Sequence, residues 1–245
     1  MTKIIHGLIS LCLITCTLSS PVLAQEIRDS KLAYNWFDQV VGIENTGLFN
    51  GIEYIEQHVT INDRQKFLGS IYFTAGNLVY NGMPYYDVEM KYNVYDDLLL
   101  LRGTGSQPLQ VHKSRVEKFS INGLDFINIR VDSTASVHGF YEIMLQDQDH
   151  LLLKQHKKKL KKFLDRSFTY FEFEEDTPGY AIALNGSYHP ANSRQEFIHV
   201  FPDRAAEIRK YYREERSTLR TDRDLFMTTL FKRLTQLSSN NNFSE

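Results

Sequence analysis

Three acidic groups stand out, namely Glu172 with Glu174, Asp96–Asp97 and Glu174–Asp176, and the first of them has the spacing that acid–base chemistry uses. Glu172 and Glu174 are two residues apart, so on a β-strand their carboxylates would share one face about 7 Å apart. Glycoside hydrolases separate their two catalytic carboxylates by about 5–10 Å, so a catalytic pair is geometrically possible. Phe171 and Phe173 would then face a core, which is equally typical of an ordinary strand with one solvated face. Asp96–Asp97 is the second pair, and no residue is assigned as catalytic.

The sequence lacks the patterns that build a serine nucleophile, a phosphate site or a metal site. No Gly-x-Ser-x-Gly turn is present. Gly103–Ser106 is rich in glycine but leads into Pro108 rather than into a helix, so it predicts a turn. His150 and His156 would share a strand face but lie about 20 Å apart, too far to bind one ion. We therefore expect no metal and no cofactor.

The densest charge feature is a basic run from Lys154 to Lys162. Six of these nine residues are lysine, including Lys157, Lys158 and Lys159. The run could bind an anionic surface such as lipid head groups or acidic glycan, because each lysine there contributes up to about 1 kcal/mol. Lysines also protect the edges of sheets from aggregation, and this is the favoured interpretation. The three consecutive lysines remain candidate binding residues.

Aromatic residues are concentrated before residue 96. Thirteen of the 31 aromatic residues lie between Tyr34 and Tyr95, and they include the single tryptophan, Trp36. Tyrosine and tryptophan can form a stacking platform for sugars or anchor a protein interface. The same residues are preferred in a half-buried antiparallel sheet. Trp36 and Tyr85 are the first candidates for a binding role.

The elements that would position these residues are mainly strands. Asn81–Gly82 and Asn122–Gly123 predict tight hairpins, because both residue types tolerate the positive φ of a type I′ turn. After the first turn, two sets of side chains alternate along the chain and predict a half-buried strand: Tyr86, Val88, Met90 and Tyr92 against Tyr85, Asp87, Glu89 and Lys91. Some ten such strands, roughly 8 to 15 residues apart, predict a mainly β fold, an antiparallel meander that forms a barrel or a sandwich.

Beyond residue 190 the pattern becomes helical and predicts a C-terminal helical hairpin packed on the sheet. Ser193 and Glu196 have the spacing of a capping box. Pro202 suits the first turn of a helix that runs to about residue 216. Thr221 and Asp224 repeat the capping pattern in a weaker form before a second helix.

The first 24 residues have the parts of an export signal. Lys3 supplies a positive charge, Ile4–Leu18 is apolar, and Val22–Ala24 presents small residues at a cleavage site. The apolar stretch is shorter than the about 20 residues that span a membrane. A lipoprotein is the alternative, because Leu13–Cys16 resembles a lipobox. Both cysteines lie in this segment, so cleavage would leave 221 residues without disulfides or thiol chemistry.

Composition and segment boundaries define the rest of the expectation. The formal net charge of −2 excludes a strongly basic nucleic-acid binder. We expect five segments: a signal peptide (1–24), a lead-in (25–50), an antiparallel β domain (51–190), C-terminal helices packed on it (191–237) and a disordered tail (238–245). The mature chain should contain no transmembrane span.

Several segments resemble an uncharacterised family of exported proteins that is common in Bacteroidota. The matching stretches are Trp36–Phe37, Val41–Thr46, Leu48–Tyr54, Tyr80–Tyr92, Gly139–Glu142, Leu152–Lys159 and Phe201–Pro202. The resemblance implies an envelope location and a recurring architecture, and it supplies no activity.

The leading hypothesis is an exported, non-enzymatic β protein in the periplasm or at the outer membrane. It would bind a ligand or an envelope partner, with envelope protein, lipid or glycan as the possible classes. One alternative is an envelope hydrolase that uses carboxylates. Another is an accessory subunit of an outer-membrane complex that docks through the C-terminal helices.

Overall fold

A computed structural model describes residues 31–241 except 38–39, 104, 131–135 and 148–149, with side chains as far as residue 235. The expected signal peptide, its two cysteines and the last four residues lie outside the described part. Eleven of its strands form one antiparallel sheet, here in spatial order: β1 (Ile52–Glu53), β5 (Leu109–Gln110), β4 (Leu98–Leu101), β3 (Met83–Asn93), β2 (Thr74–Tyr80), β6 (Val116–Ile121), β7 (Leu124–Ile129), β8 (Gly139–Asp147), β9 (His150–Gln155), β12 (Gly179–Leu184) and β13 (Ser187–Pro190).

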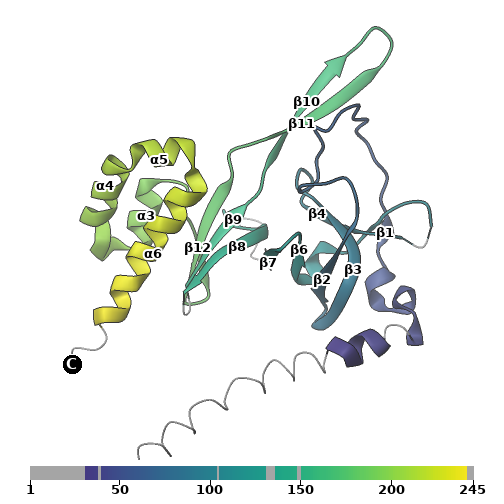
Figure 1. Ribbon diagram of the computed structural model, residues 1–245, viewed down its shortest axis with the longest axis horizontal. Coiled ribbons are helices and arrows are strands. Elements are labelled where there is room, and N and C mark those ends of the chain that lie inside the picture. The colour runs from purple at the N-terminus through teal and green to yellow at the C-terminus, as the bar shows by residue number, and fades with distance from the viewer. Residues whose placement is uncertain (1–30, 38–39, 104, 131–135, 148–149, 242–245) are drawn as a thin grey trace, which may run out of the picture.

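The mainly β, antiparallel architecture is confirmed, but the sheet is open rather than closed into a barrel. Its two edge strands, β1 and β13, do not pair with each other. Strands β10 (Lys158–Leu164) and β11 (Thr169–Glu175) leave the sheet as a separate hairpin, which projects at the top of Figure 1. The C-terminal helices, rather than a second sheet, cover the sheet at its β9 and β12 end. The edge strands are only two and four residues long, so few backbone groups are available to pair them with each other.

The predicted hairpins follow from local turn chemistry. Asn81 and Gly82 have φ of 52° and 76°, and Asn122 and Gly123 have φ of 55° and 76°. Each pair joins two neighbouring antiparallel strands, β2 to β3 and β6 to β7. Asparagine and glycine adopt this backbone conformation at little cost, which explains why these hairpins were visible in the sequence.

A β-bulge in β3 alters the predicted alternation. Gly76 pairs with Val88 and Leu78 pairs with Tyr85, so β3 has two residues where β2 has one. The two residues opposite Asn77 are Tyr86 and Asp87, and Asp87 has φ of 55°. Such a bulge shifts the side-chain phase by one residue. Tyr85 consequently joins Val88 on the buried face, and the half-buried side chain of Tyr86 lies on the other face, against Tyr34 and Lys31.

Two main hydrophobic cores lie along the sheet. Under the N-terminal half, Tyr92 contacts the rings of Phe119, Phe126 and Phe140 in edge-on geometry at centroid distances of 5.4–5.7 Å. The second core consists of residues from β9, β12 and the C-terminal helices, which lie side by side in Figure 1. The helical segments are η1 (Ile43–Asn45), η2 (Gly47–Phe49), η3 (Lys113–Arg115), α3 (Arg194–Val200), η4 (Pro202–Arg204), α4 (Ala205–Glu214), α5 (Arg216–Thr221) and α6 (Arg223–Asn241), with a further short helix at 31–37.

The C-terminal helices are confirmed, but they number four rather than two. The predicted capping box is present, with the Glu196 amide donating to Ser193 Oγ at 3.3 Å and the Ser193 amide donating to Glu196 Oε2 at 2.9 Å. It opens the separate helix α3, because the chain leaves helical geometry at Phe201 before Pro202. The predicted cap at Thr221 is wrong, since Asp222 Oδ1 accepts from the Leu225 amide at 2.9 Å. None of the helices in the described residues has the length and apolar character needed to cross a bilayer.

Candidate binding surface

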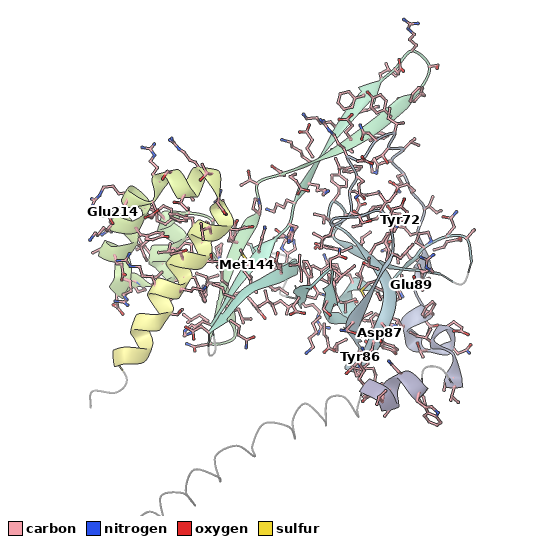
Figure 2. The ribbon with its side chains drawn as sticks, in the orientation of Figure 1. Tyr72, Tyr86, Asp87, Glu89, Met144 and Glu214 are labelled. Atoms are coloured by element: carbon pink, nitrogen blue, oxygen red, sulfur yellow. The ribbon has the colours of Figure 1, made fainter. Side chains whose placement is uncertain are left out.

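The short helix at residues 31–37 docks on the sheet through its polar side. Lys31 Nζ lies 3.0 Å from Asp87 Oδ2, and Asn35 Nδ2 donates to the same oxygen at 3.3 Å. Lys31 also lies over the Tyr86 ring, 5.5 Å from its centroid. Figure 2 shows Tyr86 and Asp87 at the end of β3 beside this helix. The bulge in β3 is what turns these two receiving side chains outward.

The apolar side of the same segment faces solvent. Trp36 is 65% exposed, and the other large apolar side chains around it are also exposed. We call this set the lead-in face: Leu32, Trp36, Phe37, Val40 and Val41. Surface helices normally bury their apolar stripe and expose their polar one, and this segment does the reverse. The predicted apolar stripe is therefore present, but it lies on the side of the helix that no other described residue buries.

Tyr85, the second aromatic candidate, is part of the core. Its side chain is only 8% exposed, and it belongs to the cluster under the N-terminal half of the sheet. The β3 bulge places it there. A sugar-stacking platform needs an open ring face, and Tyr85 presents little of its ring to the hollow that it borders with Pro84 and Phe119.

The predicted basic run lies at the end of β9 and along β10. Several of its lysines form ion pairs with glutamates of β11. Lys158 Nζ lies 3.2 Å from Glu175 and donates to the Gln65 carbonyl at 2.7 Å. Lys159 lies 3.6 Å from Glu174. Lys157 is exposed, and within the described residues it has no ion pair. The three lysines therefore do not form one cationic patch, and β10 is the edge strand that the favoured interpretation expected.

The carboxylates of Glu172 and Glu174 are also engaged in ion pairs and hydrogen bonds within the protein. Arg64 Nη1 bonds Glu172 at 2.9 Å and Glu174 at 3.3 Å, and Asn62 donates to Glu172 at 2.7 Å. A hydrogen bond from Lys161 lowers the pKa of Glu174, which keeps this carboxylate ionised. A general acid needs a raised pKa, so this environment opposes the acid–base role that the spacing suggested.

A buried lysine that sequence reasoning missed lies at a hollow of about 300 Å³. Lys66 Nζ donates to Tyr54 Oη and lies near Glu56 Oε1, both at 2.7 Å, with Asp96 Oδ2 at 3.5 Å. Burial opposes the charge of Lys66, but hydrogen bonds to Glu56 and Tyr54 outweigh it and raise its pKa. Asn93 donates to the same Asp96 oxygen at 2.7 Å. These groups satisfy one another's hydrogen-bonding capacity. We therefore interpret the cluster as structural, holding the segment before β2 in place.

The Asp96–Asp97 pair is divided between two networks. Asp96 faces Lys66, whereas Asp97 accepts from the Tyr92 hydroxyl at 2.7 Å and pairs with Lys113. Within the described residues, no group of three or more His, Cys, Asp and Glu side chains is arranged to hold a metal ion. The lead-in face, in contrast, has no contact among the described residues that would explain its exposed apolar side chains.

No protein-family model, curated protein or solved structure matches the chain. The resemblance to exported proteins of Bacteroidota consequently stays a prediction. The function must be argued from the geometry of the molecule alone, and the lead-in face is where that geometry is most informative.

Proposed function

We propose that this protein is an exported binding protein of the cell envelope that holds a protein partner on its lead-in face. One observation carries the proposal: the helix at 31–37 is bonded to the sheet through Lys31 and Asn35, so its apolar side is held outward. Exposing large apolar side chains in water is unfavourable unless a partner covers them. The fold thus supports a surface that a partner would complete.

The composition and spacing of the lead-in face favour a protein over a lipid or a sugar. Leu32, Trp36 and Val40 follow at four-residue steps, the pattern with which one helix enters an apolar groove of another protein. Tryptophan is strongly enriched among the residues that dominate protein interfaces. The neighbouring cation, Lys31, is already paired with Asp87, so the face offers little attraction to anionic lipid.

The alternative functions have less support from the geometry. The hydrolase depends on Glu172 and Glu174, whose carboxylates are held by Arg64 and Lys161. Docking through the C-terminal helices would need an open apolar face. Instead, the large apolar side chains of α3 and α6 mostly face the second core, with Leu225 as the exposed exception.

Site-specific photocrosslinking in cells that export the protein tests the proposal. A benzophenone amino acid at position 36 should yield one adduct of defined mass, and the Leu32→Ser change should reduce its yield at least fivefold. The same probe at Leu225, which is exposed on α6, is the matched control. Equal adducts from both positions, or no protein adduct from positions 32, 36 and 37, would refute a partner on this face.

A further inference from the structure

The hairpin formed by β10 and β11 ends in an apolar tip that the proposed function does not use. Leu164 is 82% exposed, and Phe168 on the opposite side of the turn is also exposed. The Asp165 amide donates to the Phe168 carbonyl at 3.0 Å and closes the turn. Below the turn, the rings of Phe163 and Tyr170 stack with centroids 5.1 Å apart. Figure 1 shows that the hairpin stands away from the main sheet.

The stem of the hairpin is fixed at its base. The Phe171 amide donates to the Val59 carbonyl and the Phe173 amide to the Arg64 carbonyl, each at 2.9 Å. The segment from residue 59 to 65 thus runs along the free side of β11. Lys158 adds its hydrogen bond to the Gln65 carbonyl. The tip is therefore presented on a braced stem rather than on a loose loop.

Two cations near the tip have no ion pair within the described residues, and the turn between them also contains Asp165. Between Lys158 and Tyr170 the chain has five basic residues and one acidic residue. The lysines nearer the base pair with the glutamates of β11, whereas Lys162 and Arg166 have no ion pair within the described residues. Both free cations thus lie beside the exposed Leu164 and Phe168.

We propose that this tip inserts into the surface of an anionic lipid bilayer. Leu164 and Phe168 would enter the apolar boundary, while Lys162 and Arg166 would contact the phosphate groups. The small apolar area of the tip argues against a protein partner there. Two apolar side chains cover far less than the about 800 Å² per partner of a stable interface. A bilayer needs no complementary shape, so a small apolar tip flanked by cations is sufficient for it.

Vesicle co-sedimentation tests the inference with protein purified from its own host, so that the wild type and all variants carry the same N-terminus. Vesicles of phosphatidylcholine are compared with vesicles that also contain phosphatidylglycerol. We expect at least tenfold stronger binding to the anionic vesicles. The pair Leu164→Ser and Phe168→Ser should remove most of that binding. The pair Lys162→Gln and Arg166→Gln should weaken it about tenfold, because each lost cation costs several-fold.

The matched controls are Leu225→Ser and Lys210→Gln on the C-terminal helices, which remove an exposed leucine and an exposed lysine that has no ion pair within the described residues. Both should bind as the wild type does. Equal binding to neutral and anionic vesicles, or equal losses in the controls, would overturn the inference. So would binding of polyglutamate at the tip with the same affinity, which would indicate an acidic protein instead. A blue shift of Trp36 emission that survives the tip changes would place the lipid contact on the lead-in face and count against both proposals.

Discussion

Reversing the charge of Lys31 should release the lead-in helix without unfolding the protein. In the folded chain Lys31 Nζ lies 3.0 Å from Asp87, and the two side chains are 39% and 59% exposed. An ion pair this exposed contributes about 0.2–1 kcal/mol. Lys31→Glu replaces the attraction by a repulsion of similar size, a change of about 0.4–2 kcal/mol. The ratio of detached to docked helix should therefore rise about 2- to 30-fold.

Trp36 reports this motion without labelling, because it is the only tryptophan in the chain. Time-resolved fluorescence anisotropy should show a larger fast component in Lys31→Glu. The melting temperature should stay within about 2 °C of the wild type, since surface changes of this kind have small effects on global stability. Lys157→Glu makes the same charge change at an exposed site away from the helix, and it should leave the anisotropy unchanged.

A second substitution separates the ion pair from other effects of the variant. Adding Asp87→Asn removes the repulsion, and asparagine tolerates the φ of 55° that position 87 adopts. The double variant should recover at least half of the lost slow component. If Lys31→Glu leaves the anisotropy unchanged, or if Asp87→Asn restores nothing, the polar contacts do not hold the helix and the outward orientation of Trp36 needs another cause.

Two further predictions concern stability. Lys66→Met should lower the free energy of unfolding by about 2–3 kcal/mol in urea titration. That is less than the about 3–5 kcal/mol for breaking a fully buried pair, because Glu56 and Asp96 can regain water. A loss below about 1 kcal/mol would contradict the structural role of Lys66. Burial raises the pKa of Tyr141 and of Tyr212 to about 12. Both tyrosines stay protonated in the folded state, so stability should be complete below pH 10 and fall between about pH 10 and 12, with tyrosinate absorbance rising together with unfolding.

The parts of the fold that were predictable depend on neighbours in sequence. The Asn81–Gly82 and Asn122–Gly123 turns and the capping box at Ser193 each involve residues within four positions of one another. The open sheet was not predictable in this way. Whether β1 meets β13 depends on pairing between segments more than one hundred residues apart, about which a two-residue period says nothing.

The candidate site likewise has parts that local sequence predicts and parts that depend on long-range pairing. An aromatic stripe at Trp36 is visible in the sequence, but strict alternation separates Tyr85 from Val88, and the bulge that brings both to the buried face has no fixed residue signature. The pairing of Lys159 with Glu174 requires the register of β10 and β11. Lys66 is an isolated lysine in a polar stretch, and nothing in its neighbours distinguishes it from a solvated charge.

The two proposed surfaces constrain each other through their positions. Figure 1 shows the lead-in helix and the β10–β11 hairpin at opposite ends of the part built from β2, β3 and β4. The helix is bonded to β3 through Asp87, and the hairpin, which is a separate two-stranded sheet, is bonded at its base to the segment 59–65, so hydrogen bonds rather than a flexible linker position both ends. We therefore expect a bilayer that receives the hairpin tip to leave the lead-in helix uncovered. Together the two proposals describe a protein that holds its partner at a fixed height above a membrane, which requires the partner's groove to lie outside the lipid.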